Sequence, residues 1–271
     1  MKKDLVLYHG NCYDGFGAAF SAWKKLGNSA TYIDVHYGQE ITIPKCKRLY
    51  ILDFSYDWET LVSFLDEAEE IFLIDHHITA YHKLKKFIGT NKKIHISFNI
   101  KKSGAYLAWE FFHNSEPPEL IKYISDRDLG LAILPLSDEI NLSLQSYPRN
   151  FLTWNNLKID NLRSDGVIIK KFFNQTVQNA IKNSWVIRMD NSRIPITNTS
   201  FGWSEICFAL MEKYNTNVSA CFTVREEYIQ VSLRSRNGYS CSEIALKNGG
   251  GGHKDSAGFL IPISELETLL P

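Results

Sequence analysis

Short apolar runs alternate with longer amphipathic stretches in the first part of the chain. The short runs predict strands, and apolar positions three and four apart predict helices. Strand and helix in regular alternation are typical of a mostly parallel sheet flanked by helices. The predicted strands are Leu5–Tyr8, Tyr32–His36, Tyr50–Asp53, Ile71–Asp75 and Ile94–Phe98, and the predicted helices are Phe16–Leu26, Trp58–Ala68 and Ala80–Phe87.

From Ser103 the pattern becomes mainly helical, and after about residue 184 it changes again to strands with two helices. We therefore predict an α/β domain over residues 1–183, helical from about residue 103, and a smaller α+β domain over residues 184–271. The predicted helices of the first region are Gly104–His113, Pro117–Asp126, Asp138–Ser146 and Asp165–Asn183. The second region is predicted to hold strands Val186–Met189, Ile194–Thr197, Val218–Val224 and Tyr228–Arg234, with helices Ser204–Tyr214 and Cys241–Leu246.

The balance of charges limits which ligands the protein attracts, and the cysteines indicate reduced thiols. The 271 residues carry 30 basic and 30 acidic side chains, and residues 184–271 hold eight Lys or Arg against nine Asp or Glu. No broad positive field is available for long nucleic acid or for an anionic membrane. The five scattered cysteines form no CxxC pair and favour reduced thiols. The apolar run near the start is too short for a signal peptide, so we predict a cytoplasmic protein and leave a homo-oligomer open.

Acids and imidazoles follow the predicted strands. His9 and Asp14 come after the first strand, Asp53 ends another, and Asp75-His76-His77 ends the next. In open α/β sheets, ligands bind at the carboxyl ends of the strands, where these residues lie. A single aspartate after a strand is commonly a helix cap or a turn residue, and a single histidine is commonly a hydrogen-bonded core residue. Three potential ligands in a row are costly to desolvate without compensation, so the set favours a site.

The order of these motifs resembles the DHH phosphoesterase superfamily, which is named for the Asp-His-His found here at Asp75–His77. His9 with Asp14-Gly15 resembles the first family motif, Asp53 the second, Asp75–His77 the third and Asp126 the fourth. The C-terminal stretch resembles the DHH-associated substrate domain, because Ser232–Arg236 precedes the glycine run Gly249–His253.

The resemblance implies two divalent cations bridged by one aspartate and a water. Asp53 would be the bridging carboxylate, Asp14, His76 and Asp126 would complete one metal site, and His9 would bind the other ion. Carboxylates with imidazoles suit Mn²⁺ best and allow Mg²⁺. The pair would activate the bridging water for in-line attack on phosphorus. Asp53 and His76 are thus candidate catalytic residues, with His77 placed to contact the phosphate or the leaving oxygen. Asp75 is a further candidate ligand, and Asp128 is expected to support the ligands rather than to bind the metal.

Position 12 departs from the family pattern, which usually has an aspartate there. This chain has Cys12, preceded by Asn11. Asn11 could ligate through its amide oxygen and Cys12 through sulfur, a poorer match to manganese. Alternatively, Cys12 is a small buried loop residue.

The glycine run has two interpretations, a flexible connection or a backbone that approaches a phosphate closely. By resemblance, Arg234 and Arg236 would pair with phosphate oxygens, and Gly250, Gly251, Gly252 and His253 would contact the substrate. Arg236 could also be an ordinary surface charge. Ser103 is either a helix N-cap or part of an amide site for phosphate.

The sequence thus predicts a manganese-dependent hydrolase, of nuclease or oligoribonuclease type, for a short substrate. It would release 5′-mononucleotides from short oligonucleotides or dephosphorylate a small nucleotide such as 3′-phosphoadenosine 5′-phosphate. The alternatives are a cyclic-dinucleotide phosphodiesterase and a non-catalytic nucleotide-binding or sensor module.

Overall fold

The computed structural model describes residues 3–10, 12–36, 39–189 and 192–271. The chain divides into two compact units, Met1–Lys170 and Lys171–Pro271. Among the described residues no helix is both long and apolar enough to cross a membrane.

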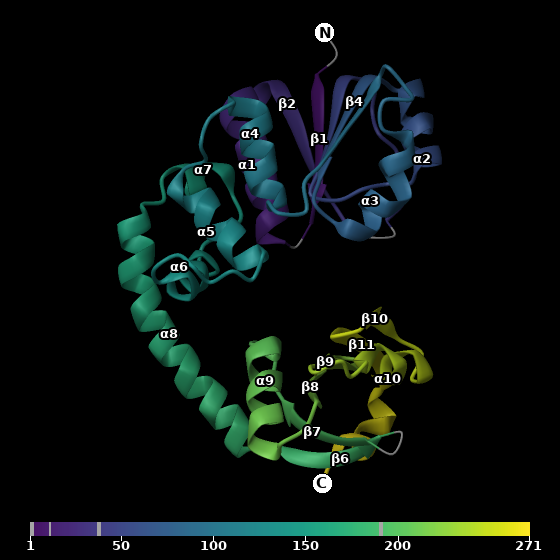
Figure 1. Cartoon of the computed structure of the whole chain (residues 1–271). Coiled ribbons are helices and arrows are strands. Elements are labelled where there is room, and N and C mark those ends of the chain that lie inside the picture. The colour runs from purple at the N-terminus through teal and green to yellow at the C-terminus, as the bar shows by residue number, and fades with distance from the viewer. Residues whose placement is uncertain (1–2, 11, 37–38, 190–191) are drawn as a thin grey trace. The chain divides into compact units, whose positions relative to one another are not determined.

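The described part of unit 1 is built on a five-stranded parallel sheet of order β2-β1-β3-β4-β5 (Figure 1). This confirms the predicted α/β class. Each strand falls within one or a few residues of its prediction, because each is a short apolar run bounded by polar residues. The strands are β1 (Asp4–His9), β2 (Ala30–Val35), β3 (Cys46–Leu52), β4 (Ala68–Asp75) and β5 (Ile94–Phe98).

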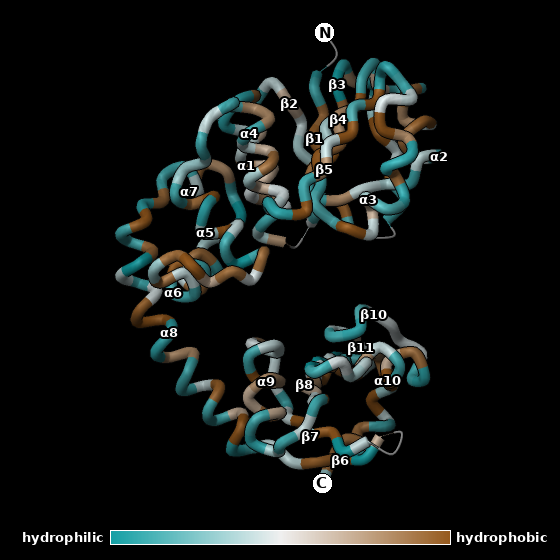
Figure 2. The backbone as a smooth tube through the Cα atoms, in the orientation of Figure 1, coloured by the Kyte–Doolittle hydropathy of each residue, from teal (hydrophilic) through white to brown (hydrophobic). Residues whose placement is uncertain are grey.

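Both faces of this sheet are buried under helices. Alternate strand residues point to opposite faces, so Leu5 and Leu7 of β1 join one core with Leu61 of α2 and Leu84 of α3. Val6 joins the opposite core, under α1 and α4. Figures 1 and 2 show these helix pairs on the two sides of the strands, with hydrophobic residues concentrated along the central strands. The helices are α1 (Tyr13–Leu26), α2 (Trp58–Ser63), α3 (Ile78–Leu84) and α4 (Gly104–His113).

Among the helices of unit 1, α2 is shorter than predicted and one further helix was not predicted. The helix predicted over Trp58–Ala68 ends at Ser63 and continues as a 3₁₀ turn, because Ala68 already belongs to β4. A short helix, α7 (Phe151–Asn155), was not predicted; its N-cap Asn150 accepts a hydrogen bond from the Thr153 N–H at 3.1 Å. The others are α5 (Glu119–Asp128), α6 (Ser137–Leu144) and α8 (Ile159–Lys182).

Helix α8 contains the division between the units, because its two halves pack on different cores. Leu162 in its first half belongs to the core of α5 and α6. Val177 in its second half packs with Leu210 of α9. The compact units therefore divide at Lys170, within the helix, whereas the predicted domain boundary at residues 183 and 184 follows the end of the helix.

Unit 2 is a mixed sheet whose described strands run in the order β10-β11-β9-β8-β7-β6. Two strands were not predicted, β10 (Gly251–His253) and β11 (Ser256–Pro262), and they form an antiparallel pair. Part of the glycine run is therefore an edge strand, which corrects the interpretation of a flexible connection. The other elements are β6 (Trp185–Met189), β7 (Ser192–Asn198), α9 (Trp203–Tyr214), β8 (Val218–Val224), β9 (Tyr228–Ser235) and α10 (Cys241–Lys247).

Two glycines of this run should differ in their tolerance of a side chain. A Cβ on Gly250 would lie 2.1 Å from the Gly258 carbonyl oxygen, whereas a Cβ on Gly251 would meet nothing within 4 Å. We expect Gly250→Ala to lower the free energy of unfolding by about 1–3 kcal/mol through steric overlap. Gly251→Ala should change it by less than roughly 0.5 kcal/mol. Denaturant melts of the two variants test this; equal stabilities would contradict the packing described here.

Candidate active site

The candidate residues gather where the sheet order changes direction. In the order β2-β1-β3, the chain moves from β1 to one side and then returns to the other, and crevices for ligands open at the carboxyl ends of such strands. His9 ends β1, Asp53 follows β3 and Asp75 ends β4. Strand pairing therefore brings together residues that are far apart in the sequence.

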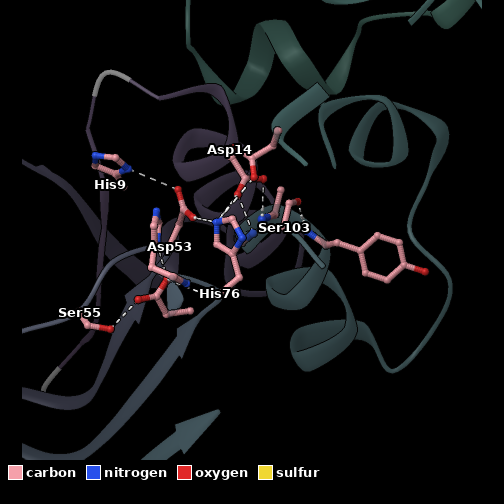
Figure 3. Close-up of polar contacts among 12 residues, drawn as sticks. His9, Asp14, Asp53, Ser55, His76 and Ser103 are labelled. Carbon is pink, nitrogen blue, oxygen red and sulfur yellow. Dashed lines mark hydrogen bonds and ion pairs between the residues drawn. The ribbon is translucent and has the colours of Figure 1, made fainter. Parts of the chain in front are cut away.

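Asp53 lies at the centre of the cluster (Figure 3). Its Oδ1 lies 3.1 Å from His76 Nε2, and its Oδ2 lies 3.5 Å from His9 Nδ1. The residue is 1% exposed, and its backbone has φ +63°, in the left-handed region that aspartate tolerates better than most residues. Its N–H donates to the Ile74 carbonyl, which anchors this turn to β4.

Asp14 is held by the amino end of another helix. Gly104 N–H and Ala105 N–H donate to its two carboxylate oxygens at 2.6 and 3.0 Å, so the positive end of the α4 dipole stabilises this buried charge. Gly104 is needed here, because a Cβ at that position would lie 2.5 Å from Asp53. Ser103 is the N-cap, accepting from Tyr106 N–H at 3.4 Å, as one of its two interpretations predicted.

The fourth motif is placed differently from the prediction. Asp126 is 3% exposed, and its carboxylate accepts hydrogen bonds from Ile133 N–H at 3.0 Å and Leu134 N–H at 3.4 Å. It therefore fixes the loop after α5. Asp128 instead enters the cluster, with its Oδ2 at 3.6 Å from His76 Nε2. Sequence reasoning noted Asp128 only as a supporting partner of the ligands, because two acids separated by one residue look equivalent without the helix geometry.

The three residues of the Asp-His-His motif make different contacts. His76 faces Asp53, whereas His77 Nδ1 lies 2.7 Å from Asp75 Oδ1. Asp75 is fully buried and also accepts from Ser55 Oγ at 2.6 Å and from His76 N–H at 2.7 Å. Asp75 is thus fully used in positioning, and it fixes which ring nitrogen of His77 faces away from it.

Burial and the charges of neighbouring residues shift the pKa values of the clustered side chains. Burial and the neighbouring Asp53 charge raise the pKa of Asp14 well above its usual range, and burial also raises the pKa of Asp128. Burial works against the ionised form of Asp53 too, but the contacts from His76 and His9 outweigh it and lower its pKa. The Asp75 contact raises the pKa of His77. A bound cation would favour the ionised form of these carboxylates.

The donor atoms fit divalent cations. Three overlapping groups place their donor atoms within 4.8 Å of one another: one of Asp53, Asp75, His76 and His77; one of His9, Cys12 and Asp53; and one of Asp14, His76 and Asp128. Oxygen and imidazole donors suit Mn²⁺ and Mg²⁺. Burial and the Asp53 charge raise the pKa of Cys12 to about 12. The predicted ligand Asn11 lies outside the described residues.

The predicted substrate residues lie in unit 2. Arg234 is on β9 and its Nε donates to Ser204 Oγ at 3.1 Å. Arg236 follows that strand, and its buried Nε has no hydrogen-bond partner among the described residues. The Gly250 N–H donates to the Ala245 carbonyl at 2.8 Å, which removes this amide from any phosphate site. His253 ends β10 and is exposed, and Gly251 and Gly252 precede it on that strand.

Comparison with known proteins identifies a domain family in the C-terminal part of the chain. Residues 203–270 match the DHHA1 domain family, the DHH-associated domain expected from the sequence. The C-terminal part of the chain therefore carries a DHHA1 domain. The predicted activity of a hydrolase acting on phosphoester bonds agrees with the names of two of the proteins compared below.

Individual relatives of this protein differ in what is known of them. Uncharacterized protein R106 of Acanthamoeba polyphaga mimivirus is 27% identical over 304 residues, which cover 99% of this chain and 69% of the relative. A segment of 41 residues, 15% of this chain and 13% of the relative, is 56% identical to the bifunctional oligoribonuclease and PAP phosphatase NrnA of Thermus thermophilus. The pGpG-specific phosphodiesterase PggH of Vibrio cholerae shares the fold, with TM-score 0.56 and 17% identity over 98% of this chain and 95% of PggH.

Substitutions of Asp126 and Asp128 in α5 should have different effects on stability and on metal binding. We expect Asp126→Asn to lower the free energy of unfolding by about 1–2 kcal/mol, because it weakens two buried hydrogen bonds to the loop. Asp128→Asn should leave stability nearly unchanged and weaken Mn²⁺ binding on the order of tenfold or more. Thermal melts and calorimetric Mn²⁺ titrations measure both effects. The reverse outcome, with metal affinity lost in Asp126→Asn alone, would restore the original motif assignment.

Proposed function

We propose that this protein is a divalent-metal-dependent phosphoesterase that hydrolyses short oligonucleotides to 5′-mononucleotides or dephosphorylates a small bisphosphorylated nucleotide. The observation that carries the proposal is the cluster around Asp53, in which four carboxylates and three imidazoles of the described residues converge at the carboxyl edge of a parallel sheet. A cytoplasmic location and the use of Mn²⁺ in the cell belong to the same proposal.

The residues divide between two cation positions that share Asp53. Asp14, His76 and Asp128 form one donor group, with Asp128 in the role that the resemblance implies for Asp126. His9 forms the other with Asp53, and Cys12 is its third donor. Two bound cations would supply an activated water and neutralise charge on the phosphate.

His77 has a separate role toward the substrate. Asp75 engages its Nδ1, so a proton or hydrogen bond can pass to the phosphate or the leaving oxygen only through Nε2. Ser55 holds Asp75 from the other side, and the two backbone amides of the motif complete its coordination by hydrogen bonds. The imidazole is thereby kept in one orientation beside the cluster.

The charge balance of unit 2 and the names of two relatives both favour a short substrate. Unit 2 offers Arg234 and Arg236 for phosphate, but its acids balance its bases, which disfavours a long polyanion. The names of NrnA and PggH describe proteins that act on oligoribonucleotides, on a bisphosphorylated nucleotide and on a linear dinucleotide. These substrate classes are therefore the ones to test.

Product analysis with Mn²⁺ tests the proposal. Linear di- to pentanucleotides should yield 5′-mononucleotides, or 3′-phosphoadenosine 5′-phosphate should yield inorganic phosphate. Asp53→Asn should reduce the rate on the order of 100-fold or more, because asparagine tolerates the left-handed backbone but removes the shared charge. Binding without turnover in Mn²⁺, Mg²⁺ or Co²⁺ would favour a sensor module, and preference for cyclic over linear dinucleotides would favour a cyclic-dinucleotide phosphodiesterase.

Ligation by Cys12 has a spectroscopic signature. With Co²⁺ as the probe, wild-type protein should show a sulfur-to-metal charge-transfer band in the near ultraviolet, because thiolate is a strong donor to this ion. Cys12→Ser should lose the band while keeping the Co²⁺ bound by Asp14, His76 and Asp128. Cys46→Ser, which alters a buried thiol on β3 away from these donor groups, is the matched control. A wild-type spectrum without the band would show that sulfur is not a ligand.

A further inference from the structure

A cavity of about 370 Å³ opens in unit 1 beside the carboxylate cluster. Asp14 and Asp128 belong both to the cluster and to the cavity wall, so a molecule with its phosphate at the cluster would extend its neighbouring group into this space. The volume falls within the usual range for small-molecule sites. The other walls come from α1, α5 and α6, all in the same compact unit.

The lining groups suit a nucleobase. Ile124 and the Tyr13 ring supply apolar surface, and Arg127 and Gln145 supply exposed hydrogen-bonding groups. Guanidinium and carboxamide groups are the side chains that pair with base edges, while aromatic and aliphatic surface accommodates base faces. Asn141 adds an amide in fixed orientation, because its nitrogen already donates to the Tyr123 and Ser137 carbonyls at 3.0 and 2.8 Å.

The same lining is unsuited to a second phosphate. Arg127 is the single cationic side chain of the wall among the described residues, and it lies 3.7 Å from Asp138, which neutralises part of its charge. Two carboxylates of the cluster complete the wall. A bare phosphate chain would meet more negative than positive charge here, whereas a neutral base carries hydrogen-bonding edges without that repulsion.

The Tyr13 ring is held in place by the core of unit 1. The Tyr13 ring packs nearly parallel to Trp154, with ring centroids 6.3 Å apart and an angle of 11° between planes. Trp154 is 1% exposed and belongs to the core of α1 and α5. The apolar wall is therefore part of the unit's own core, and the site needs little reorganisation to receive a ligand.

We propose that this cavity binds the base of the nucleotide whose phosphate lies at the carboxylate cluster, and that Arg127 and Gln145 determine which base is preferred. The inference rests on the proposed function in one respect, that the substrate is a nucleotide. It places base recognition in the metal-binding domain, in addition to the phosphate contacts expected of the DHHA1 domain.

Binding of 5′-mononucleotides tests the proposal independently of turnover. Calorimetry on the full-length chain with Mn²⁺ would compare AMP, GMP, CMP and UMP with inorganic phosphate. We expect at least one mononucleotide to bind more tightly than phosphate, and Gln145→Ala and Arg127→Met each to weaken it about tenfold, as for loss of one hydrogen bond to a base edge. Phosphate affinity should not change. The matched controls are Gln178→Ala and Arg188→Met, which alter exposed residues of α8 and β6.

Kinetics on linear dinucleotides supply a second readout. The variants should raise KM and alter the ranking of bases while kcat changes little, because base contacts act mainly on ground-state binding. Hydrolysis of bis(p-nitrophenyl) phosphate, which has no base, should be unaffected, and thermal melts would confirm folding. Base-dependent binding without hydrolysis of any nucleotide would support the cavity and overturn the proposed function. Hydrolysis with an unaltered base ranking in both variants would overturn the cavity and leave the function intact.

Discussion

The site depends on keeping several carboxylates together in a place where water cannot solvate them. Asp14, Asp53 and Asp75 are each at most 2% exposed. Buried charges of one sign repel each other and lose hydration, so such an arrangement persists only with compensating partners. The structure supplies a different compensation to each acid: helix amides to Asp14, two imidazoles to Asp53, and backbone and side-chain donors to Asp75.

This requirement explains several features that lie far apart in the sequence. The α4 amino end must reach Asp14, so Ser103 caps the helix and Gly104 leaves room for Asp53. The left-handed turn at Asp53 directs its carboxylate between His9 and His76. Compensation by hydrogen bonds is complete for Asp75 and incomplete for Asp53, whose Oδ1 accepts no hydrogen bond from the described residues. Asp53 is nevertheless the acid whose pKa is lowered, because the nearby imidazoles outweigh its burial, whereas the pKa of Asp14 is raised.

The sequence predicted the sheet and most of the cluster, because the carboxyl ends of parallel strands lie along one edge and the motifs follow those strands. It did not separate Asp126 from Asp128, since a difference of two positions on a helix turns the side chain by about half a turn, and the loop amides that occupy Asp126 come from residues 133 and 134. It also missed β10, because glycines carry no hydrophobic pattern. That strand is recognised only through its pairing with β11.

The donor groups on the two sides of Asp53 are chemically unequal. Asp14 and Asp128 with His76 offer hard oxygen and imidazole donors, the kinds that Mn²⁺ and Mg²⁺ bind. On the other side, His9 is joined by Cys12, a thiol whose pKa is raised by burial and by the same Asp53 charge. Burial and the Asp53 charge favour the protonated thiol, and the same two effects raise the pKa of Asp14. A cation could recruit the Cys12 sulfur only by displacing its proton, so binding through sulfur would release a proton.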